Sequence, residues 1–137
     1  MAGSSYHHCI VVAAPAAEVF GKLDFGTAGA LEGGADAVGC VRTLSLGKGA
    51  TIVEEQTMRA VDRGRGAYRY RYAITNADNP WEVRGYVADV AVRQATENAN
   101  QCVVTWSAKW ESANDGIAAL PSLIRHTIAQ AEPKSKI

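Results

Sequence analysis

Tyrosines and arginines alternate along the segment GAYRYRYAI, residues 66–74. Aromatic and basic residues interleaved on one strand could hold single-stranded nucleic acid, because bases stack on the rings and phosphates pair with the guanidinium groups. The same period of two could instead place Tyr68, Tyr70 and Tyr72 on one face of a strand and Arg69 and Arg71 on the other. The chemistry of this segment therefore depends on which face the tyrosines occupy.

The charge balance argues against a nucleic-acid surface. The 137-residue chain contains 14 Lys and Arg and 14 Asp and Glu, so its net charge is zero, whereas nucleic-acid-binding proteins normally carry a basic excess. A chain of this length fits a single domain, residues 1–137, and can bury enough surface to fold without a metal or a disulfide. We expect no nucleic-acid partner and no cofactor.

The cysteines and histidines suggest neither a disulfide framework nor a metal site. Cys9, Cys40 and Cys102 are odd in number and far apart, which suits a reducing compartment. His7 and His8 are neighbours, so on a strand they point to opposite faces and cannot chelate one metal. The sequence has neither a signal-peptide pattern nor a run of about 20 apolar residues. We therefore expect a cytoplasmic protein without a membrane span.

Hydrophobic periodicity predicts one sheet and two helices. The period of two predicts a strand over 6–14 and then consecutive antiparallel strands over 40–46, 51–61, 67–74, 82–93 and 101–111. An apolar spacing of three to four residues predicts a short helix over 15–23 and a final helix over 120–131. A run of strands followed by a helix indicates the α+β class. We expect a long, curved antiparallel sheet with the final helix across its concave face.

Polar side chains occur on strand faces that are otherwise apolar. Arg42 shares a face with Leu44, and Glu54 and Gln56 share a face with Ile52. An unpaired charge in an apolar core costs several kcal/mol, so these groups either pair in a structural network or line a solvent-filled cavity. The tyrosines of the 67–74 strand would suit such a cavity, because a phenol is apolar over its ring and polar at its tip. A plain core with a charged surface is the alternative.

Several segments, taken in order, resemble the START/Bet v 1-like (SRPBCC) superfamily. They are AVGCVRTLSL, EEQTMRAVD, AYRYRY, RGYVADVAV and VVTWSAKWE. The resemblance covers residues 8–111 and is greatest to the polyketide cyclase/dehydrase-like branch; the strand motifs also resemble those of lachrymatory factor synthases and fern hydroxynitrile lyases. It implies the helix-grip fold, in which a curved antiparallel sheet wraps a C-terminal helix and encloses a hydrophobic cavity.

The same resemblance assigns cavity positions to particular residues. The arginine of its G-C-V-R motif corresponds to Arg42, and two cavity tyrosines correspond to Tyr70 and Tyr86. A cavity glutamate of the synthase-like pattern falls on Gln56, which cannot act as a general acid or base. Glu54, on the same strand face, is the candidate substitute for proton transfer.

Two functions follow as expectations. The first is binding of a small hydrophobic, partly polar molecule. The second is a cofactor-independent cyclase, dehydratase or lyase, in which Arg42 stabilises an oxyanion and Tyr70 or Tyr86 donates or relays a proton. The candidate catalytic residues are Arg42, Glu54, Tyr70 and Tyr86, and the candidate ligand-binding residues are Arg42, Gln56, Tyr68, Tyr70, Tyr86 and Trp106. Because the helical regions are short, the cavity could be smaller, more open or closed by a second chain, so a homodimer is a further expectation.

Overall fold

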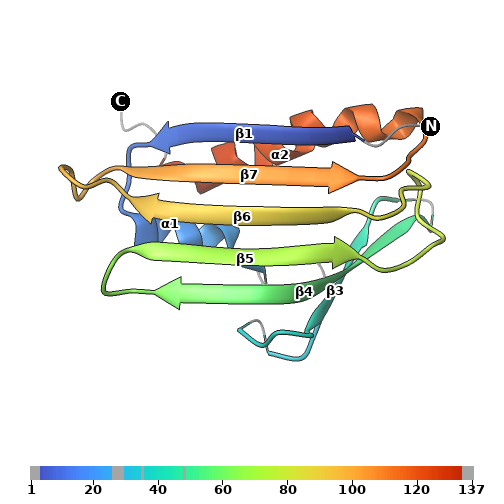
Figure 1. Cartoon of the computed structure of the whole chain (residues 1–137), viewed down its shortest axis with the longest axis horizontal. Coiled ribbons are helices and arrows are strands. Elements are labelled where there is room, and N and C mark those ends of the chain that lie inside the picture. Colours follow the sequence, from blue (N-terminus) through green and yellow to red (C-terminus); the bar gives the residue numbers. More distant parts are fainter. Residues whose placement is uncertain (1–3, 26–29, 35, 48, 134–137) are drawn as a thin grey trace.

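The computed structural model describes residues 4–25, 30–34, 36–47 and 49–133. Its elements are β1 (Ser4–Val12), α1 (Ala16–Leu23), β2 (Ala30–Glu32), β3 (Val41–Ser45), β4 (Thr51–Asp62), β5 (Ala67–Ile74), β6 (Val87–Gln94), β7 (Cys102–Trp110), a 3₁₀ helix (Asp115–Ala119) and α2 (Leu120–Ala131). The strands in this part of the chain form one antiparallel sheet in the order β1-β7-β6-β5-β4-β3-β2, and both helices lie behind it in Figure 1. The α+β helix-grip prediction is therefore confirmed.

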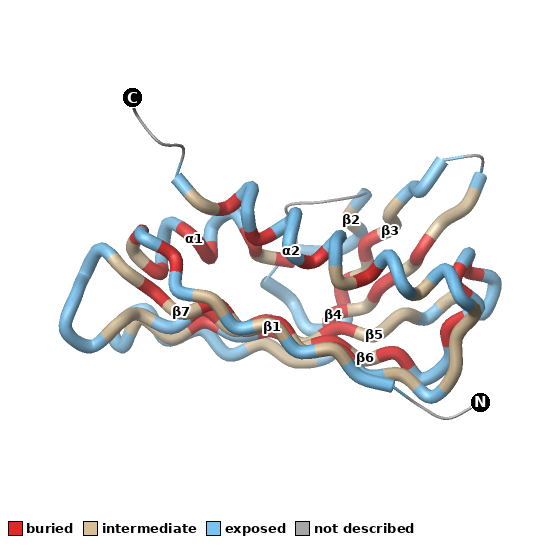
Figure 2. The backbone as a smooth tube through the Cα atoms, turned by 90° about the horizontal axis from the view of Figure 1, so that it is seen from above, coloured by how far each residue is buried: buried red, intermediate tan, exposed pale blue. Residues whose placement is uncertain are grey.

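The helices bury the stripes that their spacing predicts. In α2, Leu120, Ile124, Ile128 and Ala131 are buried, and the helix begins where Pro121 can occupy its first turn without losing a needed N–H. Figure 2 shows the sheet and the helices as two layers, with buried positions recurring along both where they meet. The apolar side chains between these layers form the core. Among the described residues, no helix is long and apolar enough to cross a bilayer.

The strand predicted over 82–93 begins later than expected. Glu82 and Gly85 have φ angles of 49° and 67°, which interrupt an extended backbone. Arg84 makes only an isolated bridge to Ser112, and β6 starts at Val87. The segment before β6 is therefore a loop that leads into the sheet.

A β-bulge in β4 changes which side chains face the helices. The register with β5 shifts between Gln56 and Met58, so one extra residue is accommodated there. Beyond the bulge, Arg59 lies opposite the buried Tyr70 and points to the inner face. Met58 and Ala60 pair with Arg71 and Arg69 on the outer face, although an uninterrupted period of two would have placed them on the inner face with Gln56.

The outer face of the sheet carries the arginines of the opening segment. Tyr68, Tyr70 and Tyr72 of β5 are buried on the face toward the helices. Arg69 donates to both oxygens of Asp89 at 2.8 and 2.7 Å. Arg71 donates to the same carboxylate at 3.2 Å. The phenols therefore face inward and the guanidinium groups face outward, which is the second of the two alternatives for this segment.

Candidate ligand-binding cavity

A cavity of about 430 Å³ lies between the inner face of the sheet and α2. Aliphatic side chains of α2, Leu120, Leu123 and Ile124, form one wall. The aromatic residues of its lining are Tyr70, Tyr72, Trp81, Tyr86 and Trp106, and its ionised residues are Arg42 and Glu54. The cavity is thus largely apolar, with a few polar groups gathered on the strands, which is the usual composition of a small-molecule site.

The ion pair of Arg42 and Glu54 is the strongest polar feature of the cavity. The two residues face each other across β3 and β4, and Arg42 Nε lies 2.6 Å from Glu54 Oε1. Their side chains are only 7% and 5% exposed. Arg42 Nη1 donates to the carbonyl of Phe25 at 2.9 Å, and the guanidinium carbon lies 4.3 Å from the centroid of that phenyl ring. Phe25 thus contacts Arg42 twice: its ring lies against the guanidinium group, and its backbone carbonyl accepts one of the N–H donors.

Burial shapes the charge of both members of this pair. Burial opposes the cation of Arg42, but Glu54 and the nearby phenols outweigh it and raise the pKa of Arg42. Burial also raises the pKa of Glu54, and Arg42 offsets this only in part. The short contact is that of a charge-assisted hydrogen bond. Glu54 is therefore a paired carboxylate that takes up a proton more readily than an exposed one.

Three phenols of the cavity remain neutral donors. Tyr70 donates to the carbonyl of Leu23 at 2.8 Å, and the hydroxyls of Tyr72 and Tyr86 lie 3.4 Å apart. Burial is the largest cause that raises the pKa of Tyr70, Tyr72 and Tyr86. Tyr70 is anchored to the end of α1, so the pair formed by Tyr72 and Tyr86 is better placed to reorient its hydroxyls toward a ligand.

Trp106 carries a buried donor without an acceptor. Its indole Nε1 has no hydrogen-bond partner in the described part of the chain, and the residue is 5% exposed. Its ring meets that of Tyr72 edge-on, at 85°. A buried donor left without an acceptor costs about 1–3 kcal/mol, so an acceptor brought to this part of the cavity wall would recover free energy.

The structure gathers most of the predicted site residues, but not all. Arg42, Glu54, Tyr70, Tyr86 and Trp106 line the one cavity. Gln56 and Tyr68 do not line it. Gln56 is buried and donates to the carbonyl of Ala37 and to Cys40 Sγ, and Tyr68 stacks on Phe20 with ring centroids 4.8 Å apart. Both therefore lie in the packed region beside the cavity.

Two aromatic residues of the cavity, Tyr72 and Trp81, were not among the candidate site residues. The period of two had placed Tyr72 on the same face as Tyr70, where it would suit a cavity, but gave it no role in binding or catalysis. Trp81 follows Pro80 in the loop before β6 and is held there because its carbonyl accepts from Asn114 N at 2.8 Å. A loop has no hydrophobic period, so no sequence pattern predicted that Trp81 would line the cavity.

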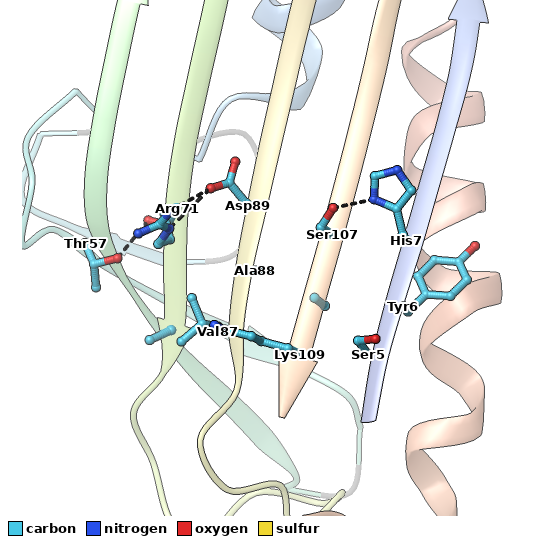
Figure 3. A pocket seen from close by; sticks show the side chains of 12 residues that line it. Ser5, Tyr6, His7, Thr57, Arg71, Val87, Ala88, Asp89, Ser107 and Lys109 are labelled. Atoms are coloured by element: carbon cyan, nitrogen blue, oxygen red, sulfur yellow. Dashed lines mark hydrogen bonds and ion pairs between the residues drawn. The ribbon is translucent and has the colours of Figure 1, made fainter. Parts of the chain in front are cut away.

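A second depression, of about 580 Å³, lies on the outer face of the sheet. Figure 3 shows Arg71, Asp89, Ser107 and His7 in a row across the strands, with His7 Nδ1 2.6 Å from Ser107 Oγ. In a nucleophilic triad the histidine lies between the hydroxyl and the carboxylate, whereas here the serine is in the middle. The described residues contain no group of three or more His, Cys, Asp or Glu that could hold a metal. The inner cavity is the better candidate site.

Comparison with known proteins gives the fold and no closer assignment. No protein-family model matches the chain, and no curated protein matches it significantly. Solved structures do match. An uncharacterized protein from Bacillus thuringiensis is 23% identical, with a TM-score of 0.67 and coverage of 93% of this chain and 95% of that one. A protein from Thermobifida fusca is also 23% identical, with a TM-score of 0.66 and coverage of 90% and 84%.

An enzyme is among these structural neighbours. Norcoclaurine synthase from Thalictrum flavum, solved in complex with dopamine and hydroxybenzaldehyde, is 19% identical, with a TM-score of 0.60 and coverage of 98% of this chain and 90% of that one. Identities this low show the fold alone. The chain therefore has the helix-grip fold of the Bet v 1-like proteins.

Proposed function

We propose that this protein binds a small, hydrophobic, partly polar molecule in the cavity between the sheet and α2. The observation that carries the proposal is the buried ion pair of Arg42 and Glu54 in an otherwise aromatic and aliphatic wall. Charges in a plain core are replaced by apolar residues at little or no loss of stability. Their place at a cavity wall is better explained by a ligand that uses them.

The proposed contacts follow from the polar atoms of the wall. The guanidinium group of Arg42 has five N–H donors. Glu54 and the Phe25 carbonyl use two of them and the Tyr70 hydroxyl uses a third, so two are left for a ligand oxygen. The hydroxyls of Tyr72 and Tyr86 and the indole of Trp106 supply further donors, and the aromatic rings pack on the ligand's apolar part.

Gln56 and Tyr68 take supporting places in this proposal. Gln56 Oε1 accepts from Arg59 at 3.2 Å, and Arg59 binds both oxygens of Asp24 at 2.7 and 2.9 Å. This network fixes the end of α1, where the backbone carbonyl of Leu23 receives Tyr70. Gln56 would therefore position the wall without touching the ligand, and Tyr68 would do the same through its ring contact with Phe20 of α1.

A second candidate is a cofactor-independent enzyme of the cyclase, dehydratase or lyase type, within the START/Bet v 1-like superfamily and its polyketide cyclase/dehydrase-like branch. The observation that favours it is the raised pKa of Glu54 beside Arg42. Such a carboxylate could remove a proton from a substrate while the guanidinium group stabilises the resulting oxyanion. Tyr70 or Tyr86 would then donate a proton to the product, and the phenol would recover the proton held by Glu54. A norcoclaurine synthase among the structural neighbours is compatible with chemistry in this cavity.

Native mass spectrometry of freshly purified protein tests the binding function. We expect a co-purified small molecule on the wild type. Leu44→Trp, which fills the cavity, should remove it, because Leu44 lines the wall. Thr43→Trp is the matched control, because Thr43 is the next residue on β3 and points to the other face. A molecule that stays bound to Leu44→Trp would contradict the proposed site.

A further inference from the structure

We infer that the cavity selects a ligand that is uncharged overall and that places an acceptor oxygen against Arg42 and a hydrogen-bond donor against Glu54. This inference rests on the proposed binding function and adds the chemical class of the ligand. It makes Glu54 the residue that determines charge specificity, because this carboxylate already occupies the position that an anionic ligand would need.

The charges around the cavity cancel before any ligand arrives. Among the described residues that line it, Arg42 and Glu54 are the ionised ones. Arg59, which does not line the cavity, is likewise paired with Asp24, with contacts of 2.7 and 2.9 Å, so these two charges also offset each other. The phenols are neutral, because burial raises their pKa values. A ligand therefore meets a site with strong dipoles but no net charge.

A charged ligand would disturb this balance in either direction. A carboxylate ligand that bound Arg42 would lie beside Glu54 or displace it, and a displaced carboxylate in a site this buried is strongly unfavourable. A cationic ligand would meet the same difficulty at Arg42. An uncharged group with a carbonyl and an adjacent N–H or O–H avoids both, because it can accept from the cation and donate to the carboxylate at the same time.

The other polar side chains of the cavity wall are mainly hydrogen-bond donors, so they favour the carbonyl oxygen of such a ligand. Tyr72 and Tyr86 have hydroxyls 3.4 Å apart, and Trp106, which lines the cavity, has a buried N–H that lacks an acceptor among the described residues. The wall thus offers more donors than acceptors, with Glu54 as its carboxylate. A flat aromatic or conjugated skeleton with a carbonyl fits the rings that surround these groups.

Three isosteric probes separate charge from shape: 2-naphthamide, 2-naphthoate and 2-naphthamidinium. They are neutral, anionic and cationic at pH 7.5, and each can be titrated into wild-type protein by calorimetry. We expect 2-naphthamide to bind about tenfold or more tighter than either ion, since one charge-assisted hydrogen bond accounts for that much affinity. In Glu54→Gln, the freed Arg42 should reverse the order, with 2-naphthoate the tightest of the three.

The controls keep each outcome decisive. If Glu54→Gln does not fold, the double variant Arg42→Met/Glu54→Leu replaces it. It should bind 2-naphthamide about tenfold or more weakly than wild type, because both polar partners of the amide are gone, and unchanged binding of the amide would overturn this inference. Equal binding of 2-naphthoate and 2-naphthamide to wild type, abolished by Leu44→Trp, would overturn this inference and leave the proposed function standing. Binding of no probe, or binding that Leu44→Trp leaves unchanged, would contradict both.

Discussion

Arg42 and Glu54 face each other across adjacent antiparallel strands, with 2.6 Å between Nε and Oε1, at the wall of a cavity. Their pairing has both a structural role and a proposed role in ligand binding. It satisfies two charges that burial would otherwise penalise, and it presents those charges to the space between the sheet and α2. Stability and ligand binding should therefore depend on the same two side chains.

A double-mutant cycle measures the structural part of this pair. Arg42→Met and Glu54→Leu should each lower the free energy of unfolding by roughly 3–5 kcal/mol, because each leaves a buried charge without its partner. The double variant should recover most of that loss, since apolar side chains tolerate the site. Urea unfolding gives the three values. Arg69→Ala, in the exposed pair with Asp89, is the control and should cost at most about 1 kcal/mol. Additive losses in the double variant would mean that the two side chains act independently.

The loop before β6 should depend on the backbone conformation of Gly85. Its φ of 67° is unfavourable for a side chain, and a Cβ there would lie 2.7 Å from Glu111 atoms. Gly85→Ala should therefore lower the free energy of unfolding by about 1–2 kcal/mol. In Gly21→Ala, in α1, the new Cβ meets nothing within 4 Å, so the helix should gain up to about 1 kcal/mol. Thermal melts of the two variants compare them, and equal shifts of the same sign would contradict the assigned backbone.

The buried phenols predict how the protein responds to alkali. Burial raises the pKa values of Tyr70, Tyr72 and Tyr86 above the ordinary tyrosine value. A raised folded-state pKa contributes stability that is fully present below the unfolded pKa, about 10, and is lost as pH rises beyond it. Absorbance at 295 nm should show these phenols protonated at pH 10.5 in folded protein and ionised after urea is added. Full ionisation of all the tyrosines before unfolding would show that the cavity wall is open to solvent.

The outer ion pairs predict a smaller effect in acid. Burial alone would raise the pKa of Asp89, but the hydrogen bonds and charges of Arg69 and Arg71 outweigh it and lower this pKa. A lowered carboxyl pKa contributes stability above the unfolded value, about 4, that is lost as pH falls through the folded value. Because the pairs are partly exposed, the contribution should stay below about 1 kcal/mol. In Asp89→Asn, the decrease in the free energy of unfolding between pH 5 and pH 2 should be smaller than in wild type by that amount. An unchanged decrease would exclude Asp89 as a source of the acid sensitivity.

Strand periodicity predicted more of the fold than of the site. Alternation from Tyr68 to Tyr72 is enough to place the phenols together on one face, because one strand fixes its own two faces. The contact between Arg42 and Glu54 depends on the register between two strands, which neither strand contains by itself. The bulge after Gln56 and the loop that holds Trp81 come from tertiary packing, so no local pattern could have revealed them.

The most direct test of the cavity as a binding site is a crystal structure of the wild-type protein with 2-naphthamide. We predict the naphthalene ring among Tyr72, Tyr86 and Trp106, with the amide oxygen within hydrogen-bond distance of Arg42 and its nitrogen directed toward Glu54. Density for the probe only in the outer depression beside His7 and Ser107, or an inner cavity closed by its own side chains, would contradict this site.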